Sequence, residues 1–384
     1  MMKCKNCGLP ETYETIEFDQ NEVCNICKQH NFKNETINWD ERKKILSDLI
    51  NDYRGKYDYD CIIPFSGGKD STYTLYHLVK EFKIKPLVVQ FNHGFMRPNL
   101  LENNERTFKR LGVDTISFTP NWKTVKRVML ESLIRKGDFC WHCHTGIFSY
   151  PMQVAIKYNV PLVFWGEPSS EYTAYYDYRD NEIEEVDEER FNKVTNLGIT
   201  AEDMKGMIES DFDLDPRDLL NFTYPAARDL RKINYRSVCL GSFIPWNVQE
   251  QSNIIKKELG WKGDFVEGMP PEIYNYEKIE CSMQGVRDYI KYLKRGYSRV
   301  SQMTALDIRN GKMKKLEADL LIEKWEGKKP HSLKIFLEYL EITEKEFNDY
   351  IVKLVVPPNV PDFNSEWSDP TPDFNKWFRE EKID

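Results

Sequence analysis

The sequence contains no apolar run that approaches the ~20 residues needed for a membrane-spanning helix. Its first five residues, MMKCK, lack the apolar core of a secretion signal. The chain also lacks an excess of positive charge, since its net charge is −8, and this argues against a dedicated nucleic-acid binder. We therefore expect a cytoplasmic protein without membrane attachment, and we do not expect nucleic acid as a partner.

In a chain without a secretion signal, nine cysteines indicate metal or redox chemistry before disulfide bonds. Four of them form two pairs, Cys4-x2-Cys7 and Cys24-x2-Cys27, with sixteen residues between the pairs. This spacing is typical of a four-cysteine zinc site, and the intervening residues suit the hairpin of a zinc ribbon. We predict that residues 1–33 form a zinc ribbon in which these four cysteines hold a structural Zn²⁺.

The string SGGKDS at residues 66–71 is the strongest chemical signal in the chain, because it joins an apolar run to a helical pattern. Paired glycines let the backbone approach a ligand closely, and amides at a helix N-terminus favour an anion. The glycines lie too close to Lys69 for the common G-x-x-x-x-G-K-[ST] phosphate loop. The residues expected to bind a phosphate group are Ser66, Gly67, Gly68, Lys69, Asp70 and Ser71.

Strands and helices alternate along residues 34–268, which predicts an α/β fold with a doubly wound parallel sheet. The expected strands lie near residues 60–65, 87–91, 114–118, 162–165 and 237–240. Ligands bind at the carboxyl ends of such strands, so Gly166 and Glu167, which follow the fourth strand, are expected in the same ligand site. Glu167 or Glu171 is a candidate ligand for Mg²⁺, which prefers carboxylate oxygens.

Two further segments depart from this pattern: one interrupts it and one follows it. Seven acidic residues between Asp180 and Glu189 belong to an insertion at about 177–220, which we expect to be solvated and to cover the site. After the prolines at 270 and 271 the character changes, and residues 269–384 are predicted to form a helical C-terminal region that ends in an extended tail.

Cys140 and Cys143 form a third cysteine pair with several open interpretations. They are consistent with a helix start packed on the sheet, with a second structural zinc site, or with a redox or substrate-facing role. Another alternative is an iron–sulfur cluster with Cys239 or Cys281 as the third ligand, because three cysteines can hold a cluster that leaves one iron open. We do not favour the cluster.

The SGGKDS string resembles the pyrophosphate loop of the PP-loop ATP pyrophosphatases, which implies that this loop, Gly166 and Glu167 bind ATP. The four-cysteine start, this loop, the GEPSSEY turn at 166–172 and the strings KRGYSR at 294–299 and DIRNGK at 307–312 together resemble the N-acetyl sugar amidotransferases. That family acts in bacterial surface-polysaccharide and nonulosonic-acid biosynthesis. The resemblance covers essentially the whole chain.

The resemblance implies that ATP adenylates the N-acetyl carbonyl of a nucleotide-linked sugar and that ammonia then displaces AMP, which gives an acetamidino sugar. It also implies separate glutaminase and cyclase-like subunits that supply the ammonia. Lys69 and Asp70 are the expected catalytic residues: Lys69 would stabilise the departing pyrophosphate, and Asp70 would orient the loop or hold Mg²⁺. The basic residues expected to bind the diphosphate of the sugar substrate are Lys294, Arg295, Arg299 and Arg309.

Two alternatives remain at this stage. A PP-loop tRNA thiolase would use Cys140 and Cys143 with an iron–sulfur cluster, but the acidic balance of the chain argues against it. The second alternative is a zinc-ribbon scaffold without catalytic activity, which would give no role to the SGGKDS loop.

Overall fold

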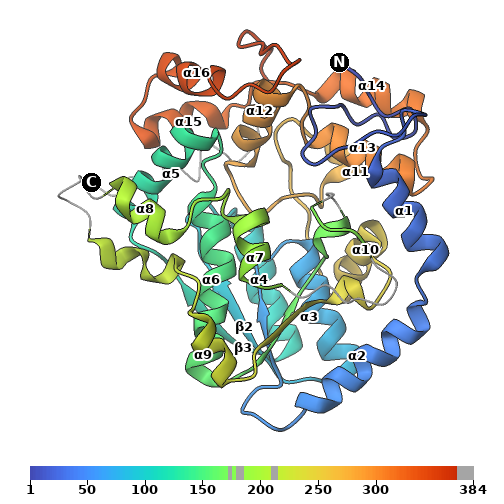
Figure 1. Cartoon of the computed structure of the whole chain (residues 1–384), viewed down its shortest axis with the longest axis vertical. Coiled ribbons are helices and arrows are strands. Elements are labelled where there is room, and N and C mark those ends of the chain that lie inside the picture. The colour runs from blue at the N-terminus through green and yellow to red at the C-terminus, as the bar shows by residue number, and fades with distance from the viewer. Residues whose placement is uncertain (172–174, 179–185, 209–214, 370–384) are drawn as a thin grey trace.

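The computed structural model describes residues 1–171, 175–178, 186–208 and 215–369 (Figure 1). Within these residues, five parallel strands form one sheet in the order β3–β2–β1–β4–β5. The strands are β1 (Cys61–Pro64), β2 (Pro86–Phe91), β3 (Asp114–Phe118), β4 (Leu162–Trp165) and β5 (Arg236–Cys239). This confirms the predicted parallel α/β fold, and it places the reversal of strand order between β1 and β4, where such sheets bind ligands.

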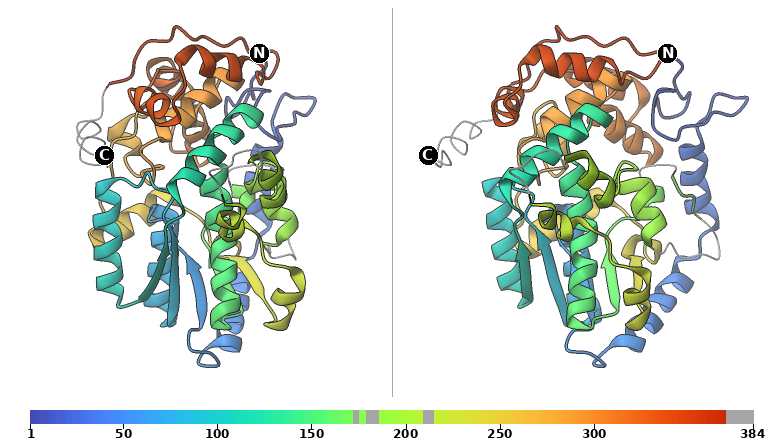
Figure 2. Two further views of the ribbon diagram at one scale, coloured as in Figure 1. Left: turned by 90° about the vertical axis from the view of Figure 1, so that its left-hand side faces the viewer. Right: turned by 60° about the vertical axis from the view of Figure 1, so that its left-hand side comes forward.

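Helices cover both faces of the sheet (Figures 1 and 2). Those of the sheet domain and its insertion are α2 (Trp39–Tyr53), α3 (Lys69–Phe82), α4 (Pro98–Leu111), α5 (Trp122–Lys136), α6 (Trp141–Tyr158), α7 (Glu188–Arg190), α8 (Ala201–Ile208), α9 (Ala227–Lys232) and α10 (Val248–Leu259). None of the helices in the described residues is both long enough and apolar enough to cross a membrane.

Neighbouring residues of each strand face opposite cores, because side chains alternate along a strand. Ile63 of β1 and Val88 of β2 belong to the core beneath α3 and α10, whereas Ile62 and Leu87 belong to the core beneath α6. Burial on both faces explains why β1, β2 and β4 read as largely apolar runs in the sequence.

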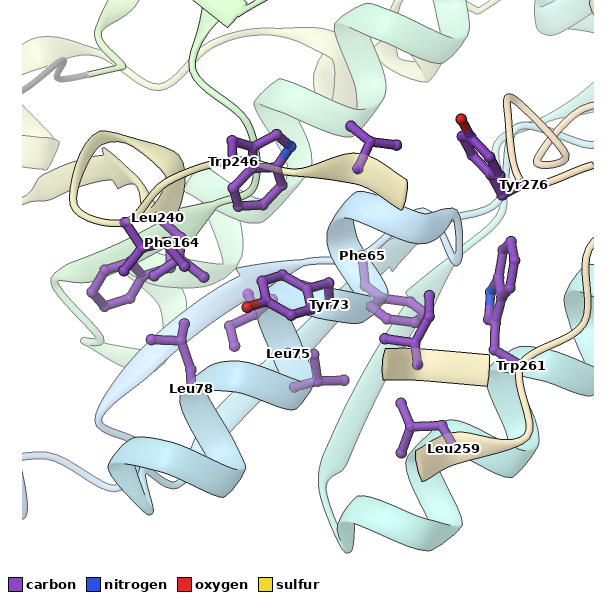
Figure 3. Packing of buried hydrophobic residues seen from close by; sticks show 14 of the residues in the cluster. Phe65, Tyr73, Leu75, Leu78, Phe164, Leu240, Trp246, Leu259, Trp261 and Tyr276 are labelled. Atoms are coloured by element: carbon purple, nitrogen blue, oxygen red, sulfur yellow. The ribbon is translucent and has the colours of Figure 1, made fainter. Parts of the chain in front are cut away.

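The larger of these cores fixes the start of α3, which carries the SGGKDS loop. Leu75 and Leu78 of α3 belong to the same apolar cluster as Phe65 and Trp261, and Figure 3 shows Leu75 near the Phe65 ring. The Trp261 indole also donates a hydrogen bond to the carbonyl oxygen of Gly67 at 3.1 Å. The loop is therefore anchored by packing below and by a hydrogen bond from the segment that follows α10.

The C-terminal helices gather beyond one end of the sheet (Figure 2). They are α11 (Pro271–Tyr274), α12 (Gln284–Arg295), α13 (Arg299–Arg309), α14 (Lys315–Trp325), α15 (Ser332–Leu340) and α16 (Glu344–Val352). Val286 and Leu293 of α12 form one apolar cluster with Val125 and Met129 of α5, so this region packs directly on the sheet domain. The predicted acidic run and the end of the predicted tail lie partly outside the described residues, at 180–185 and 370–384.

The N-terminal module is built from turns rather than from a regular hairpin. Isolated bridges join Lys3 to Pro10 and Phe18 to Cys24, and helix α1 (Asn25–Thr36) begins directly after Cys24. Because α1 continues to Thr36, it runs through residue 33, where the sequence predicted the module to end. The helix carries the chain from the cysteines to the sheet domain.

Candidate functional site

A pocket of about 310 Å³ opens at the carboxyl ends of β1, β4 and β5. Its lining includes five of the residues predicted to bind ATP, namely Ser66, Asp70, Ser71, Gly166 and Glu167. The described part of the insertion contributes to the wall through Val186, Arg190, Phe191 and Thr195, and the C-terminal region contributes Lys278 and Glu280. Three parts of the chain that are far apart in sequence therefore meet at one pocket.

Gly67 and Gly68 allow the loop to lie against its neighbours. The φ angle of Gly67 is +87°, and a Cβ there would lie 2.1 Å from Oδ1 of Asn104. A Cβ on Gly68 would lie 1.7 Å from Oε1 of Glu280. Glycine is required at the first position by both backbone conformation and space, and the second glycine lets a carboxylate of the C-terminal region approach the loop.

The loop amides point at hydroxyl groups. The N–H groups of Ser66 and Gly67 donate to Oγ of Ser71 at 3.3 and 3.1 Å, and the N–H of Gly68 donates to Oγ of Ser66 at 3.3 Å. Since these donors lie at the N-terminus of α3, whose dipole attracts negative charge, the arrangement is suited to bind an anion.

Lys69 is directed toward the C-terminal region. Its Nζ lies 2.8 Å from Oδ2 of Asp70 and 2.7 Å from Oε2 of Glu277, and only 3% of its side chain is exposed. Burial raises the pKa of Glu277, but the charges of Lys69, Lys278 and Arg299 outweigh this and lower it to about 2. Lys69 is not among the residues that line the pocket, so its predicted contact with pyrophosphate stays a prediction.

Carboxylate oxygens suited to a divalent cation face this pocket. Within the described residues, Oδ1 of Asp70 and Oε2 of Glu280 are buried without a hydrogen-bond partner. Burial and the nearby charge of Asp70 raise the pKa of Glu167 to about 8. Hard carboxylate ligands that lack a protein partner fit Mg²⁺, whose charge would also favour ionised Glu167.

Glu171, the other candidate ligand for Mg²⁺, has different partners. Nζ of Lys33 lies 3.0 and 2.9 Å from its two carboxylate oxygens, and the Tyr178 hydroxyl donates to Oε2 at 2.7 Å. Glu171 does not line the pocket. Its buried carboxylate instead ties helix α1 to the turn after β4.

The four basic residues predicted to bind the sugar diphosphate do not come together. Lys294 donates to the carbonyl oxygen of Lys136 at 2.5 Å, and Arg295 donates to that of Thr12 at 2.6 Å. Arg299 lies 3.6 Å from carboxylate oxygens of both Glu277 and Asp288. None of the four lines the pocket, and Arg299 is the one connected to Lys69, through Glu277.

Arg309 lies beside the cysteine module. Burial lowers its pKa, but the thiols of Cys7 and Cys27 outweigh this and raise it. This places its positive charge where a four-thiolate metal site would carry negative charge. The expected contact with a sugar diphosphate stays a prediction, because its surroundings are those of the cysteine site.

The four N-terminal cysteines bring their sulfur atoms within 4.8 Å of one another, and all four are buried. Sγ of Cys4 lies 3.9 Å from Sγ of Cys27, and Sγ of Cys7 lies 3.7 Å from Sγ of Cys24. Such a closed set of four thiols is compatible with a metal ion. Among the described residues, it is the one group of potential ligands that meets this spacing.

Cys140 and Cys143 lie at the start of α6. Cys140 shares an apolar cluster with Cys281, and burial raises the pKa of both Cys140 and Cys143. No ligand set within 4.8 Å includes this pair in the part of the chain that the structure describes. Cys239 lies at the end of β5 and lines the pocket beside the SGGKDS loop instead.

Residues missed by sequence reasoning come from one short segment, 275–281, which carries Glu277, Lys278 and Glu280. No local motif distinguishes these charged residues from a solvated loop. Only the tertiary contacts with Lys69 and Gly68 place them at the pocket.

Comparison with known proteins gives one family match. Residues 272–368 match the family described as LPS biosynthesis protein WbpG-like, C-terminal domain. This part of the chain is therefore similar to that domain family, and the match supports the resemblance to the sugar amidotransferases. A relative from Methanocaldococcus jannaschii, an uncharacterized protein, is 28% identical over 147 residues, which are 37% of this chain and 50% of the relative.

Two solved structures are similar at low identity. The NMN synthetase from Francisella tularensis is 12% identical, with 58% of this chain and 96% of that chain covered and a TM-score of 0.29. The U34-tRNA thiolase NcsA from Methanococcus maripaludis with its 4Fe-4S cluster is 15% identical, with 84% of this chain and 89% of that chain covered and a TM-score of 0.30.

Proposed function

We propose that this protein is an ATP-dependent enzyme of surface-polysaccharide biosynthesis that converts the N-acetyl group of a nucleotide-linked sugar into an acetamidino group. The observation that carries the proposal is the pocket at which the SGGKDS loop, the turn after β4 and the C-terminal region meet. Lipopolysaccharide biosynthesis is the process named for the family that this C-terminal region matches.

The chemistry begins with an amide carbonyl, which is a poor electrophile. Its oxygen attacks the α-phosphorus of ATP, and pyrophosphate leaves. Ammonia then adds to the activated carbon, AMP departs with the former carbonyl oxygen, and a proton is released. The product is an amidine, and each turnover consumes one ATP and one ammonia.

The loop supplies the stabilisation that the first step needs. The amides of Gly67 and Gly68, together with the hydroxyls of Ser66 and Ser71, would bind the departing pyrophosphate at the N-terminus of α3. Donors that are already oriented stabilise developing negative charge without reorganising. The hydroxyls that now accept these amide hydrogens would rotate and donate to the phosphate oxygens.

Asp70 and Glu167 would hold Mg²⁺, since both line the pocket and Oδ1 of Asp70 has no protein hydrogen-bond partner in the described residues. When bound, Mg²⁺ neutralises charge on the phosphate oxygens. The Lys69 ammonium pairs with Oδ2 of Asp70, and Oδ1 has no hydrogen-bond partner among the described residues.

The N-terminal cysteines would hold a structural Zn²⁺, because four buried thiols complete a closed tetrahedral set. Tyr13 of this module packs on Tyr297 with ring centroids 5.1 Å apart, so the metal would stabilise a surface that supports α12 and α13. We propose that the ammonia comes from separate glutaminase and cyclase-like subunits and that the reaction takes place in the cytoplasm.

A product assay tests this function. The protein is incubated with ATP, Mg²⁺ and an ammonium salt against UDP- and CMP-linked N-acetyl sugars, with bulk tRNA as a separate acceptor, and the products are followed by mass spectrometry. We expect AMP, pyrophosphate and a sugar in which one oxygen is replaced by NH. AMP release with tRNA alone would replace this function by the thiolase alternative and would direct attention to Cys140, Cys143 and Cys281.

A further inference from the structure

Lys69 of the SGGKDS loop is ion-paired, whereas the ammonium of Lys278 has no hydrogen-bond or ion-pair partner among the described residues. It is half-buried and lines the nucleotide pocket beside Asp70, Glu167 and Glu280. The carboxylates of Asp70 and Glu280 would repel the phosphates of a nucleotide unless nearby positive charge compensated them. Lys278 supplies such a charge from the C-terminal region.

The backbone at Lys278 is held in an uncommon conformation. Its φ angle is +51°, in the left-handed region that a residue with a branched or long side chain adopts at a cost of about 1 kcal/mol or more. Such a conformation persists where the surrounding structure determines it. Here the residues on either side are fixed, since Glu277 pairs with Lys69 and Glu280 lies against Gly68.

The ion pair between Lys69 and Glu277 therefore connects the SGGKDS loop to the segment that carries Lys278. Both side chains are 3% exposed, and Nζ of Lys69 lies 2.7 Å from Oε2 of Glu277. On the opposite side of Glu277, Arg299 of α13 lies 3.6 Å from Oε1. Glu277 is thus held between two cations, and neither of them lines the pocket.

We propose that Lys278 is the lysine that binds the nucleotide phosphates in this pocket, and that Lys69 and Glu277 are positioning residues that hold it there. This inference rests on the proposed use of ATP at the same site. It assigns to the C-terminal region a direct contact with the nucleotide. Lys69, which the sequence alone predicts as the phosphate ligand, instead pairs with the carboxylates of Asp70 and Glu277. A lysine can bind phosphate as a point charge, without the paired geometry of arginine.

Equilibrium binding of ATP and of adenosine, both with Mg²⁺, tests the contact. We expect Lys278→Met to weaken ATP binding roughly 10- to 100-fold, the loss of one charged hydrogen bond, and to leave adenosine binding unchanged. Lys278→Arg should retain most of the ATP affinity. Lys262→Met is the matched control, because Lys262 is exposed and does not line the pocket. Unchanged ATP affinity in Lys278→Met, or an equal loss for adenosine, would overturn the contact.

A double-mutant cycle tests the positioning role. We expect Glu277→Gln to weaken ATP binding in the otherwise unchanged protein and to have little further effect in the Lys278→Met background, because the two residues act on one contact. Glu277→Asp should recover part of the affinity. The positioning role would be contradicted if the losses of ATP-binding free energy in the two single variants added in the double variant. It would also be contradicted if the losses followed the unfolded fraction measured by circular dichroism.

These binding measurements do not depend on the sugar product. If Lys278→Met weakens ATP binding while the unmodified protein converts no N-acetyl sugar, the contact stands and the proposed reaction falls. If sugar is converted and the Lys278 variants bind ATP normally, the reaction stands and the contact falls.

Discussion

Lys33 of helix α1 and Glu171 of the turn after β4 form a buried ion pair between the cysteine module and the sheet domain. The two side chains are 7% and 3% exposed, and Nζ lies 2.9 Å from Oε2. Because the same turn carries Glu167, this pair links the module that would hold zinc to the wall of the proposed nucleotide pocket.

Lys33→Met should destabilise the protein by about 3–5 kcal/mol, because it leaves the Glu171 carboxylate buried without its cation. Urea unfolding followed by circular dichroism measures the free energy of unfolding. Lys5→Met is the control, since Lys5 pairs with Glu22 on the surface and such pairs contribute about 1 kcal/mol or less. Equal losses of unfolding free energy in the two variants would show that the buried pair stabilises the protein no more than the surface pair does.

One zinc ion per chain is expected by elemental analysis, held by the four buried N-terminal thiols. Cys4→Ser should lose the metal and lower solubility, because Cys4 completes the ligand set and the module packs on the C-terminal helices. Cys143→Ser should keep the zinc. Stoichiometric iron and a visible absorbance after anaerobic purification, both lost in Cys143→Ser, would show that the α6 cysteines hold a cluster.

Asp70→Asn should lower the rate of AMP formation roughly 100-fold or more, because the variant removes a charged ligand for Mg²⁺ while it preserves the size of the side chain. The rate is measured by chromatography of the nucleotides across a Mg²⁺ titration, with near-ultraviolet circular dichroism as the test of folding. Asp319→Asn serves as the control, since Asp319 pairs with Lys315 on the exposed face of α14. A folded Asp70→Asn protein with full activity would remove Asp70 from the mechanism.

The raised pKa of Glu167, about 8, predicts a dependence of stability on pH. Between pH 4.5 and 8 the folded protein keeps a proton on Glu167 that the unfolded chain releases, so this group makes the protein less stable as pH rises. Glu167→Gln should flatten that part of the profile, measured by thermal unfolding from pH 5 to 8.5 without Mg²⁺. For the same reason, Mg²⁺ should bind more tightly as pH rises toward 8. Parallel profiles for the two proteins would contradict the assignment.

Much of the fold follows from local patterns. The predicted strand at 162–165 coincides with β4, and helices α4 and α5 lie between predicted strands, as the alternation of strands and helices indicates. A strand buried on both faces needs a continuous apolar run, and Gly112 and Gly137 end these helices in the left-handed conformation. Such signals are read from neighbouring residues and need no knowledge of the tertiary structure.

Only part of the site could be predicted from local sequence patterns. The glycines and serines of the SGGKDS loop could be predicted, because an anion site at a helix N-terminus has a local sequence signature. A charged residue such as Lys294 carries no signature that separates a ligand contact from a contact with protein. The structure shows that Lys294 donates to the carbonyl oxygen of Lys136.

The sequence by itself determined the α/β class, the spacing of the four cysteines and the position of the anion-binding loop, because each depends on residues that are close together along the chain. Only the tertiary structure decided that Glu277 would pair with Lys69, that Lys278 would line the pocket and that Glu171 would be held by Lys33. Burial changes what a charged side chain does: in water a lysine or glutamate is solvated, whereas in the interior it must find an opposite charge or a ligand. Which partner it finds depends on how distant segments pack.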